Sequence, residues 1–345
     1  MTRIKHCCLL GIFAALGVCS NVPTAHSQEV LVFSGIDEVI DWLKSENFWG
    51  EENRGQQLTV PYVMLTGITQ RWRDTAQQLH VPYKKEIFYR LMVPLILHAN
   101  KMVMERREAL FQAQETLAAG DKIPAADMQA IRDGAVLLRV SDAESAASLT
   151  QESAALLTVI DELIYKLDII PAGLALGQAA YESGYGTSRF AVQGNALFGQ
   201  WTFGGKGLVP EQQRKSLGDH RIAAFDWPFD SVRGYFINLM SHPAYEDFRR
   251  LRANLRAKGE PLTSMALADG LIRYSERGQE YVDTLKSIIR VNGLAIADDA
   301  TFRDEPMRFA VGAESAEKAA ELRTEIERMR ASGELAQIIQ RMRLE

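Results

Sequence analysis

Apolar positions recur at helical spacing along most of the chain, and this pattern predicts a protein built mainly of helices. The first such face carries Ile36, Val39 and Ile40, and the helical pattern continues through residues 30–151. Pro94 interrupts the longest stretch, where a proline removes a backbone donor and crowds the preceding turn. We therefore expect a kink or a new helix start near Pro94.

The second half of the chain also has a helical pattern, which is interrupted once. A helix is predicted from Pro171 to about Ser183, because proline suits a first turn and the glycines Gly184 and Gly186 follow its end. Residues 194–225 lose the helical period and are rich in glycine and aromatic residues, which predicts loops and a small hairpin. Helices are then predicted from Ser231, at 261–274 and at 278–291, followed by an acidic linker at 298–305. The expected fold class is all-α dominated, or α+β at most.

The first 27 residues have the features of an export signal. Arg3 and Lys5 precede an apolar run at 7–18, and small residues at 25–27 offer a cleavage site. The run is shorter than the roughly 20 residues that span a membrane, and no later stretch reaches that length. All three cysteines lie in this segment, so the mature chain would form no disulfide. We expect an exported protein of the periplasm without a membrane span.

Composition narrows the classes of function. The net charge of −5 provides no basic face, so a nucleic-acid partner is not expected. His220 and His242 lack neighbouring ligands at zinc spacing, and no metal or organic cofactor is expected. No Gly-x-Ser-x-Gly motif supports a serine hydrolase.

Glu182 is the candidate for acid catalysis. It shares a helix face with Gln178, four residues earlier, and lies at the helix end beside a glycine turn. The negative end of the helix dipole and aromatic neighbours such as Tyr185 and Phe198 would both raise the pKa of this carboxyl. A pKa lifted from roughly 4.3 toward roughly 6 keeps a proton available for a glycosidic oxygen. A lone glutamate on a helix is otherwise most often a solvated surface residue.

The residues around Glu182 resemble the bacterial endo-β-N-acetylglucosaminidase family, in particular its Bax-like branch. The resemblance is carried by the run ESGYGTSRFA at 182–191, the run QGNALFGQW at 193–201 and further matches at 206–210 and at Tyr274. It extends over about residues 159–292. The family implies a lysozyme-like domain with a small loop or hairpin lobe. It also implies cleavage of the β-1,4 bond after N-acetylglucosamine in peptidoglycan.

The resemblance and the composition together suggest four parts of the chain. They are a signal peptide at 1–27, a helical N-terminal region at 28–155, a glucosaminidase domain at 156–296 and a charged helical tail at 297–345. The N-terminal helices and the tail offer surfaces for envelope protein partners.

The resemblance implies that Glu182 is the general acid and that Tyr274 lies opposite it. The second catalytic group is open, because glycosidases normally use two carboxylates. Glu211 is the first choice, and Asp219 and Asp226 are the alternatives. A 2-acetamido group of the substrate can instead attack its own anomeric carbon, in which case Tyr274 or Asn195 would orient that group. The residues expected to bind substrate are Gln178, Tyr185, Asn195, Phe198, Trp201 and Tyr281.

Two other functions are compatible with these observations. A lytic transglycosylase shares the fold and the acid, but it typically carries a Gly-Leu-Met-Gln signature where this chain has NALFG at 195–199. A non-catalytic wall-binding or scaffolding protein would use the long helices and the tail as docking surfaces. Aromatic residues such as Trp201 are also common in cores, so their role as sugar platforms is open.

Overall fold

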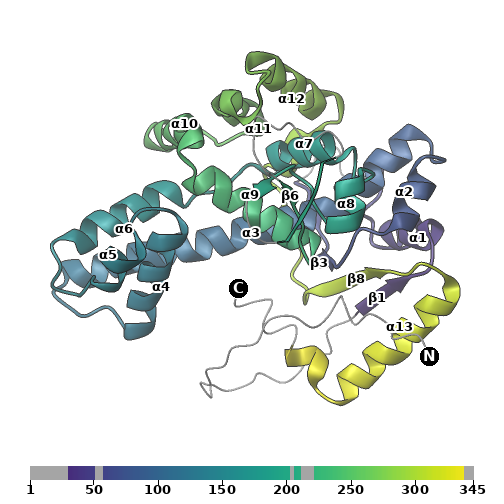
Figure 1. Cartoon of the computed structure of the whole chain (residues 1–345), viewed down its shortest axis with the longest axis horizontal. Helices are drawn as coiled ribbons and strands as arrows, with labels where there is room; N and C mark the ends of the chain where they lie inside the picture. Colours follow the sequence, from purple (N-terminus) through teal and green to yellow (C-terminus); the bar gives the residue numbers. More distant parts are fainter. Residues whose placement is uncertain (1–29, 51–56, 203–205, 211–220, 338–345) are drawn as a thin grey trace.

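The computed structural model describes residues 30–50, 57–202, 206–210 and 221–337. The predicted export signal, Glu211 and Asp219 lie outside these residues. Helices dominate the described part, and three small sheets accompany them (Figure 1). The predicted fold class, helix-dominated with a minor β component, is confirmed. Within the described residues, no helix is both long enough and apolar enough to cross a membrane.

The N-terminal region contains three strands as well as helices, so the prediction of helix throughout 30–151 is wrong in part. The run VLVF at 30–33 is rich in β-branched and aromatic residues and pairs as a strand. The elements of this region are β1 (Val30–Phe33), α1 (Ile36–Ser45), β2 (Thr59–Val60), β3 (Val63–Leu65), α2 (Gln70–Ala76), α3 (Val81–Ala118), α4 (Ala125–Leu137), α5 (Ala143–Ala147) and α6 (Ala155–Lys166).

The middle of the chain follows the predicted order closely. Its helices are α7 (Ala172–Ser183), α8 (Arg189–Gly194), α9 (Pro228–Ser241), η2 (Pro243–Tyr245), α10 (Glu246–Ala257), α11 (Ser264–Leu267), η3 (Ala268–Tyr274), α12 (Gln279–Val291) and η4 (Leu294–Ala297). Its strands β4 (Trp201–Thr202), β5 (Gly207–Leu208) and β6 (Arg221–Ala223) form an antiparallel sheet in the order β4-β6-β5. This sheet is the small lobe that was expected between residues 194 and 225.

The C-terminal segment is not purely helical, which corrects the prediction of a helical tail. Its elements are β7 (Thr301–Phe302), β8 (Arg308–Gly312) and α13 (Ala316–Ala331). Strand β8 is the centre of a parallel sheet in the order β1-β8-β3, with Val30 opposite Phe309. Strand β7 lies within the segment predicted as a linker, and it pairs with β2. The two ends of the described chain therefore lie side by side (Figure 1).

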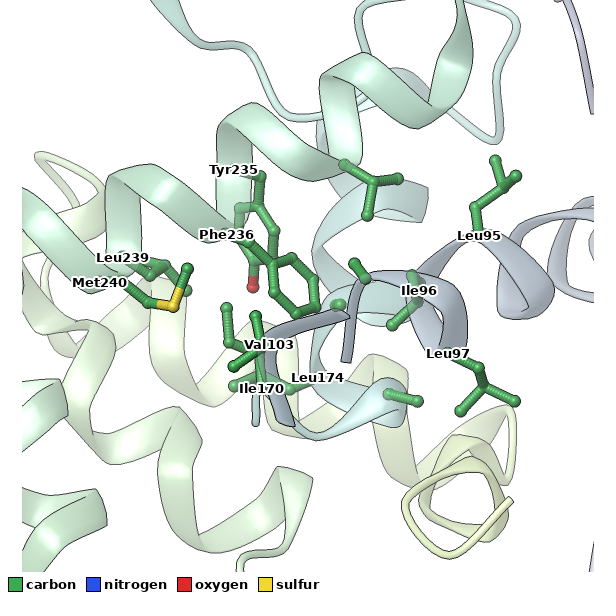
Figure 2. Close-up of a cluster of buried hydrophobic side chains, with 14 of the residues drawn as sticks. Leu95, Ile96, Leu97, Val103, Ile170, Leu174, Tyr235, Phe236, Leu239 and Met240 are labelled. Carbon is green, nitrogen blue, oxygen red and sulfur yellow. The ribbon is translucent and has the colours of Figure 1, made fainter. Parts of the chain in front are cut away.

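Helix α3 is the longest helix of the described residues and passes through the core. It continues without interruption through Pro94, so no new helix starts there. Its buried residues Leu95, Ile96 and Val103 belong to the same buried cluster as Leu174 of α7 and Phe236 of α9 (Figure 2). Burying large apolar side chains of this kind contributes roughly 1.5–3 kcal/mol each. The helix thus joins the N-terminal region to α7 and α9 in one core.

Helix α7 is fixed at its start by a residue from the other end of the chain. Gly173 N donates to Asp298 Oδ1 at 2.9 Å, and Ser264 N donates to Asp298 Oδ2 at 2.7 Å. One carboxylate therefore caps the first turns of both α7 and α11, where backbone N–H groups lack helical partners. Further along α7, Gly177 leaves room for Leu285 and Ile289 of α12. Asp298 and the α12 contact together set the position of α7.

Loss of the Asp298 cap is predicted to destabilise the protein. Asp298→Ala leaves two backbone N–H groups without their acceptor and should lower the free energy of unfolding by about 2 kcal/mol. The exposed neighbour Asp299 is the matched control, and Asp299→Ala should change that free energy by less than about 0.5 kcal/mol. Urea unfolding of both variants measures the difference. Equal effects from the two would show that Asp298 is no cap.

Candidate active site

Glu182 is the penultimate residue of α7 and is half-buried. The helix ends at Gly184, which adopts the left-handed conformation with φ 58° as its position after a helix favours. The next residue, Tyr185, also has a left-handed backbone, and Trp72 Nε1 donates to its carbonyl oxygen at 3.0 Å. The N-terminal region thus holds the loop that follows Glu182.

A buried set of hydrogen bonds lies behind the Glu182 carboxyl. Tyr281 Oη donates to Glu182 Oε1 at 3.1 Å, and Gln178 Nε2 donates to Tyr281 Oη at 2.9 Å. Tyr235 Oη in turn donates to Gln178 Oε1 at 2.5 Å. Tyr281, Gln178 and Tyr235 are each at most 1% exposed. Gln178 and Tyr281, predicted as substrate contacts, therefore lie in the interior, where Tyr281 contacts the acid and Gln178 contacts Tyr281.

Aromatic rings complete the surroundings of Glu182. Tyr274 stacks on Tyr281 with ring centroids 5.5 Å apart, and its hydroxyl donates to the carbonyl oxygen of Phe198 at 3.0 Å. The ring of Phe198 is buried and stacks on Tyr235 at 4.0 Å. Phe198 is therefore a core residue whose backbone anchors Tyr274, and its ring presents no open face to a sugar in this structure.

Burial raises the pKa of Glu182 to about 6, and the hydrogen bond from Tyr281 opposes this by stabilising the carboxylate. The direction is the one expected from the sequence. A group with a pKa near 6 holds a proton on roughly a tenth of molecules at pH 7, compared with well under a hundredth for an ordinary glutamate. The carboxyl is therefore suited to donate a proton near neutral pH.

The other predicted substrate contacts lie in different settings. Trp201, in β4, is 50% exposed. Tyr185 is half-buried against Phe88 and Tyr89. Asn195 uses its amide on the backbone: it accepts from Ile68 N at 2.9 Å and donates to the carbonyl oxygens of residues 225 and 226 at 3.1 Å. Its visible role is to tie the small lobe to the N-terminal region.

Of the three candidates for a second carboxylate, only Asp226 is among the described residues. It pairs with Lys206 Nζ at 3.0 Å on the small lobe and is about half exposed. The roles of Glu211, Asp219 and Asp226 remain predictions.

Neither of two well-formed cavities among the described residues is lined by Glu182. One lies between the β1-β8-β3 sheet and helices α1 to α3, and the other lies between α3, α4 and α9. The sugar groove expected beneath Glu182 stays a prediction.

Two contributors to the site were not recognised from the sequence. Tyr235 lies on an apolar face of α9, where helical spacing indicates only a core position. Asp298 was assigned to a linker, because nothing local distinguishes a buried capping aspartate from a solvated one. Both act through contacts between segments that are distant in sequence.

Comparison with known proteins shows what the part of the chain that carries this site is similar to. Residues 159–294 match the glucosaminidase family model, described as mannosyl-glycoprotein endo-beta-N-acetylglucosaminidase. The chain is also 29% identical over 214 residues to Protein bax of Escherichia coli (strain K12). The aligned region covers 62% of this chain and 72% of that protein. No solved structure matches the chain. The resemblance predicted from the residues around Glu182 is confirmed, and it supports a glycan hydrolase.

The raised pKa of Glu182 predicts a pH-dependent effect on stability. Its carboxyl is protonated in both folded and unfolded chains below about pH 4.5, and burying its charge costs stability as the pH rises toward about 6. Glu182→Gln keeps an acceptor for Tyr281 and should raise the free energy of unfolding by about 1–2 kcal/mol at pH 7.5, but little at pH 4.

Urea unfolding at the two pH values measures this effect. The exposed Glu152 provides the control, since Glu152→Gln should change stability by similar small amounts at both. A Glu182→Gln variant that is less stable than wild type at pH 7.5 would contradict a desolvated carboxyl.

Proposed function

We propose that the chain is an exported peptidoglycan hydrolase that cleaves the β-1,4 bond after N-acetylglucosamine, with Glu182 as its general acid. The observation that carries the proposal is a half-buried carboxyl with a pKa near 6 inside a domain of the glucosaminidase family. No cation among the described residues lowers the pKa of Glu182, and burial of this kind keeps an acid protonated near neutral pH.

The proposed reaction moves one proton and adds one water. Glu182 gives its proton to the glycosidic oxygen while the bond from that oxygen to the anomeric carbon breaks. Water then adds its oxygen to the anomeric carbon and releases a proton to a base. Glu211, Asp219 and Asp226 are the candidates for that base. In the alternative route, the acetamido oxygen of the substrate attacks the anomeric carbon as the glycosidic bond breaks, and water then displaces that oxygen and releases its proton to solvent. Solvent returns a proton to Glu182.

The substrate class is the finer part of the proposal. The family description names a mannosyl-glycoprotein, whereas the matches at 182–201 and the expected export signal favour the bacterial wall. Both substrates contain N-acetylglucosamine in β-1,4 linkage. Digestion of purified peptidoglycan and of a mannosyl-glycoprotein in parallel separates them, and the proposal expects turnover of peptidoglycan.

Glu182→Gln is predicted to abolish wall digestion without loss of folding. Removal of a general acid should lower kcat by about 10²–10⁴-fold, whereas Glu152→Gln should retain full activity. Mass spectrometry of the released fragments measures both the rate and the product. We expect new reducing ends on N-acetylglucosamine.

Two results of this experiment would contradict the proposal in different ways. Anhydromuramic ends without new reducing N-acetylglucosamine would identify a lytic transglycosylase. Undiminished effects of the Glu182→Gln protein on the wall would instead identify a binding or scaffolding protein.

The pH dependence of the reaction follows from the same pKa. The acid must carry its proton, so kcat/KM should fall about tenfold per pH unit above about pH 6. Initial rates on a soluble wall fragment between pH 4.5 and pH 8.5 measure this limb. Rates that stay constant up to pH 8 would exclude Glu182, with its present pKa, as the essential acid.

A further inference from the structure

The two oxygens of the Glu182 carboxyl have different surroundings. Oε1 accepts the hydrogen bond from Tyr281. Oε2 has no hydrogen-bond partner among the described residues. It faces Gly199, where a side-chain carbon would lie 3.5 Å from it. Because residue 199 has no side chain, that residue places no side-chain atom over Oε2.

The hydrogen bonds that lead to Oε1 run in one direction. A tyrosine hydroxyl has a single proton, and Tyr281 Oη already accepts from Gln178 Nε2, so its own proton points to Glu182. The orientation of Gln178 is set by Tyr235, whose hydroxyl donates to Gln178 Oε1. Turning the amide over would leave the phenol proton of the fully buried Tyr235 without this acceptor, which is costly in an interior.

We propose that Tyr281 is a positioning residue that occupies Oε1 of Glu182 in both protonation states, so that the catalytic proton resides on Oε2 and leaves from there. This inference rests on the proposed function, because the proton on Oε2 is transferred only if Glu182 acts as a general acid. In the neutral acid, Oε1 is the carbonyl oxygen, which accepts from Tyr281 as the carboxylate does. The carboxyl therefore keeps one orientation before and after proton transfer.

The groups that face Glu182 do not ionise in the pH range where it titrates, so a change in its pKa can be assigned to the loss of the Tyr281 contact. Among the described residues, the titratable side chains whose pKa is raised by a negative charge on Glu182 are Tyr235 of α9, Tyr245 of η2, Tyr274 of η3 and Tyr281 of α12. All four are phenols that stay neutral in the range where Glu182 titrates. On α3, Lys84 and Lys85 lie over the ring of Tyr185 and are not among the groups that shift the pKa of Glu182.

Tyr281→Phe tests the proposal while keeping the stacked ring. The lost hydrogen bond stabilises the carboxylate, so its removal should raise the pKa of Glu182. The alkaline limb of kcat/KM should move up by about half to one pH unit. The plateau at low pH should fall about tenfold, because the carboxyl is no longer held in one orientation.

The chain offers a matched control at another tyrosine–glutamate pair. Tyr165 Oη donates to Glu246 Oε1 at 2.7 Å between α6 and α10. Tyr165→Phe removes the same kind of hydrogen bond from a different pair and should leave the limb unchanged. Tyr235→Phe removes the hydrogen bond that fixes the side-chain amide of Gln178, so the amide can rotate. The alkaline limb of kcat/KM should then shift in the same direction as in Tyr281→Phe, but by less.

A second measurement needs no activity. The free energy of unfolding is measured from pH 4 to pH 8 for wild type, Tyr281→Phe and Tyr235→Phe, each with and without Glu182→Gln. The pH dependence of each difference reports the titration of Glu182 in that background. The proposal expects the midpoint to rise in both tyrosine variants.

The outcomes separate the inference from the proposed function. An unchanged titration midpoint of Glu182 in both tyrosine variants contradicts the proposed hydrogen bonds from Tyr235 through Gln178 and Tyr281 to Glu182. A lower midpoint contradicts them as well. A raised midpoint in a protein that never cleaves peptidoglycan contradicts the proposed function but leaves the hydrogen-bond chain in place. A raised midpoint together with a raised alkaline limb supports both.

Discussion

The site depends on the removal of the Glu182 carboxyl from water at the end of α7. Burial disfavours its charge, and the single hydrogen bond from Tyr281 limits how far the pKa rises. Both effects are needed, because a fully exposed carboxyl would be ionised at neutral pH, and a buried one without a donor would release its proton too reluctantly. The balance gives a pKa of about 6, which leaves a usable protonated fraction near neutral pH.

The scaffold that maintains this balance extends beyond the domain that matches the glucosaminidase family. The match ends at residue 294, yet Asp298 caps the first turn of α7, and Trp72 holds the loop after Glu182. Strand β8 lies between β1 and β3 and thus ties the C-terminal segment to the N-terminal region. The flanking segments therefore position the acid, although they carry none of its chemistry.

The sequence predicts the features of the site that are local and misses those that are not. The limits of α7 and its glycine turn follow from residues adjacent in the chain, and the structure agrees with them. The sequence also predicts the upward direction of the pKa shift of Glu182, although the burial that causes it, beside Tyr281 of α12, involves segments distant in sequence. The pairing of β1 with β8 joins opposite ends of the chain, and no periodicity within either segment indicates it. Asn195 shows the same limit: its type and motif are visible in the sequence, but the backbone groups that it binds are not.

The most direct test of this account is the titration of the Glu182 carboxyl itself. Carbon-13 NMR of protein labelled at the glutamate carboxyls follows this group, and its signal is identified by its absence from Glu182→Gln. The account predicts a midpoint at about pH 6. A midpoint at or below 4.5, the ordinary value, would show that the carboxyl is solvated, and the assignment of Glu182 as the acid would fail.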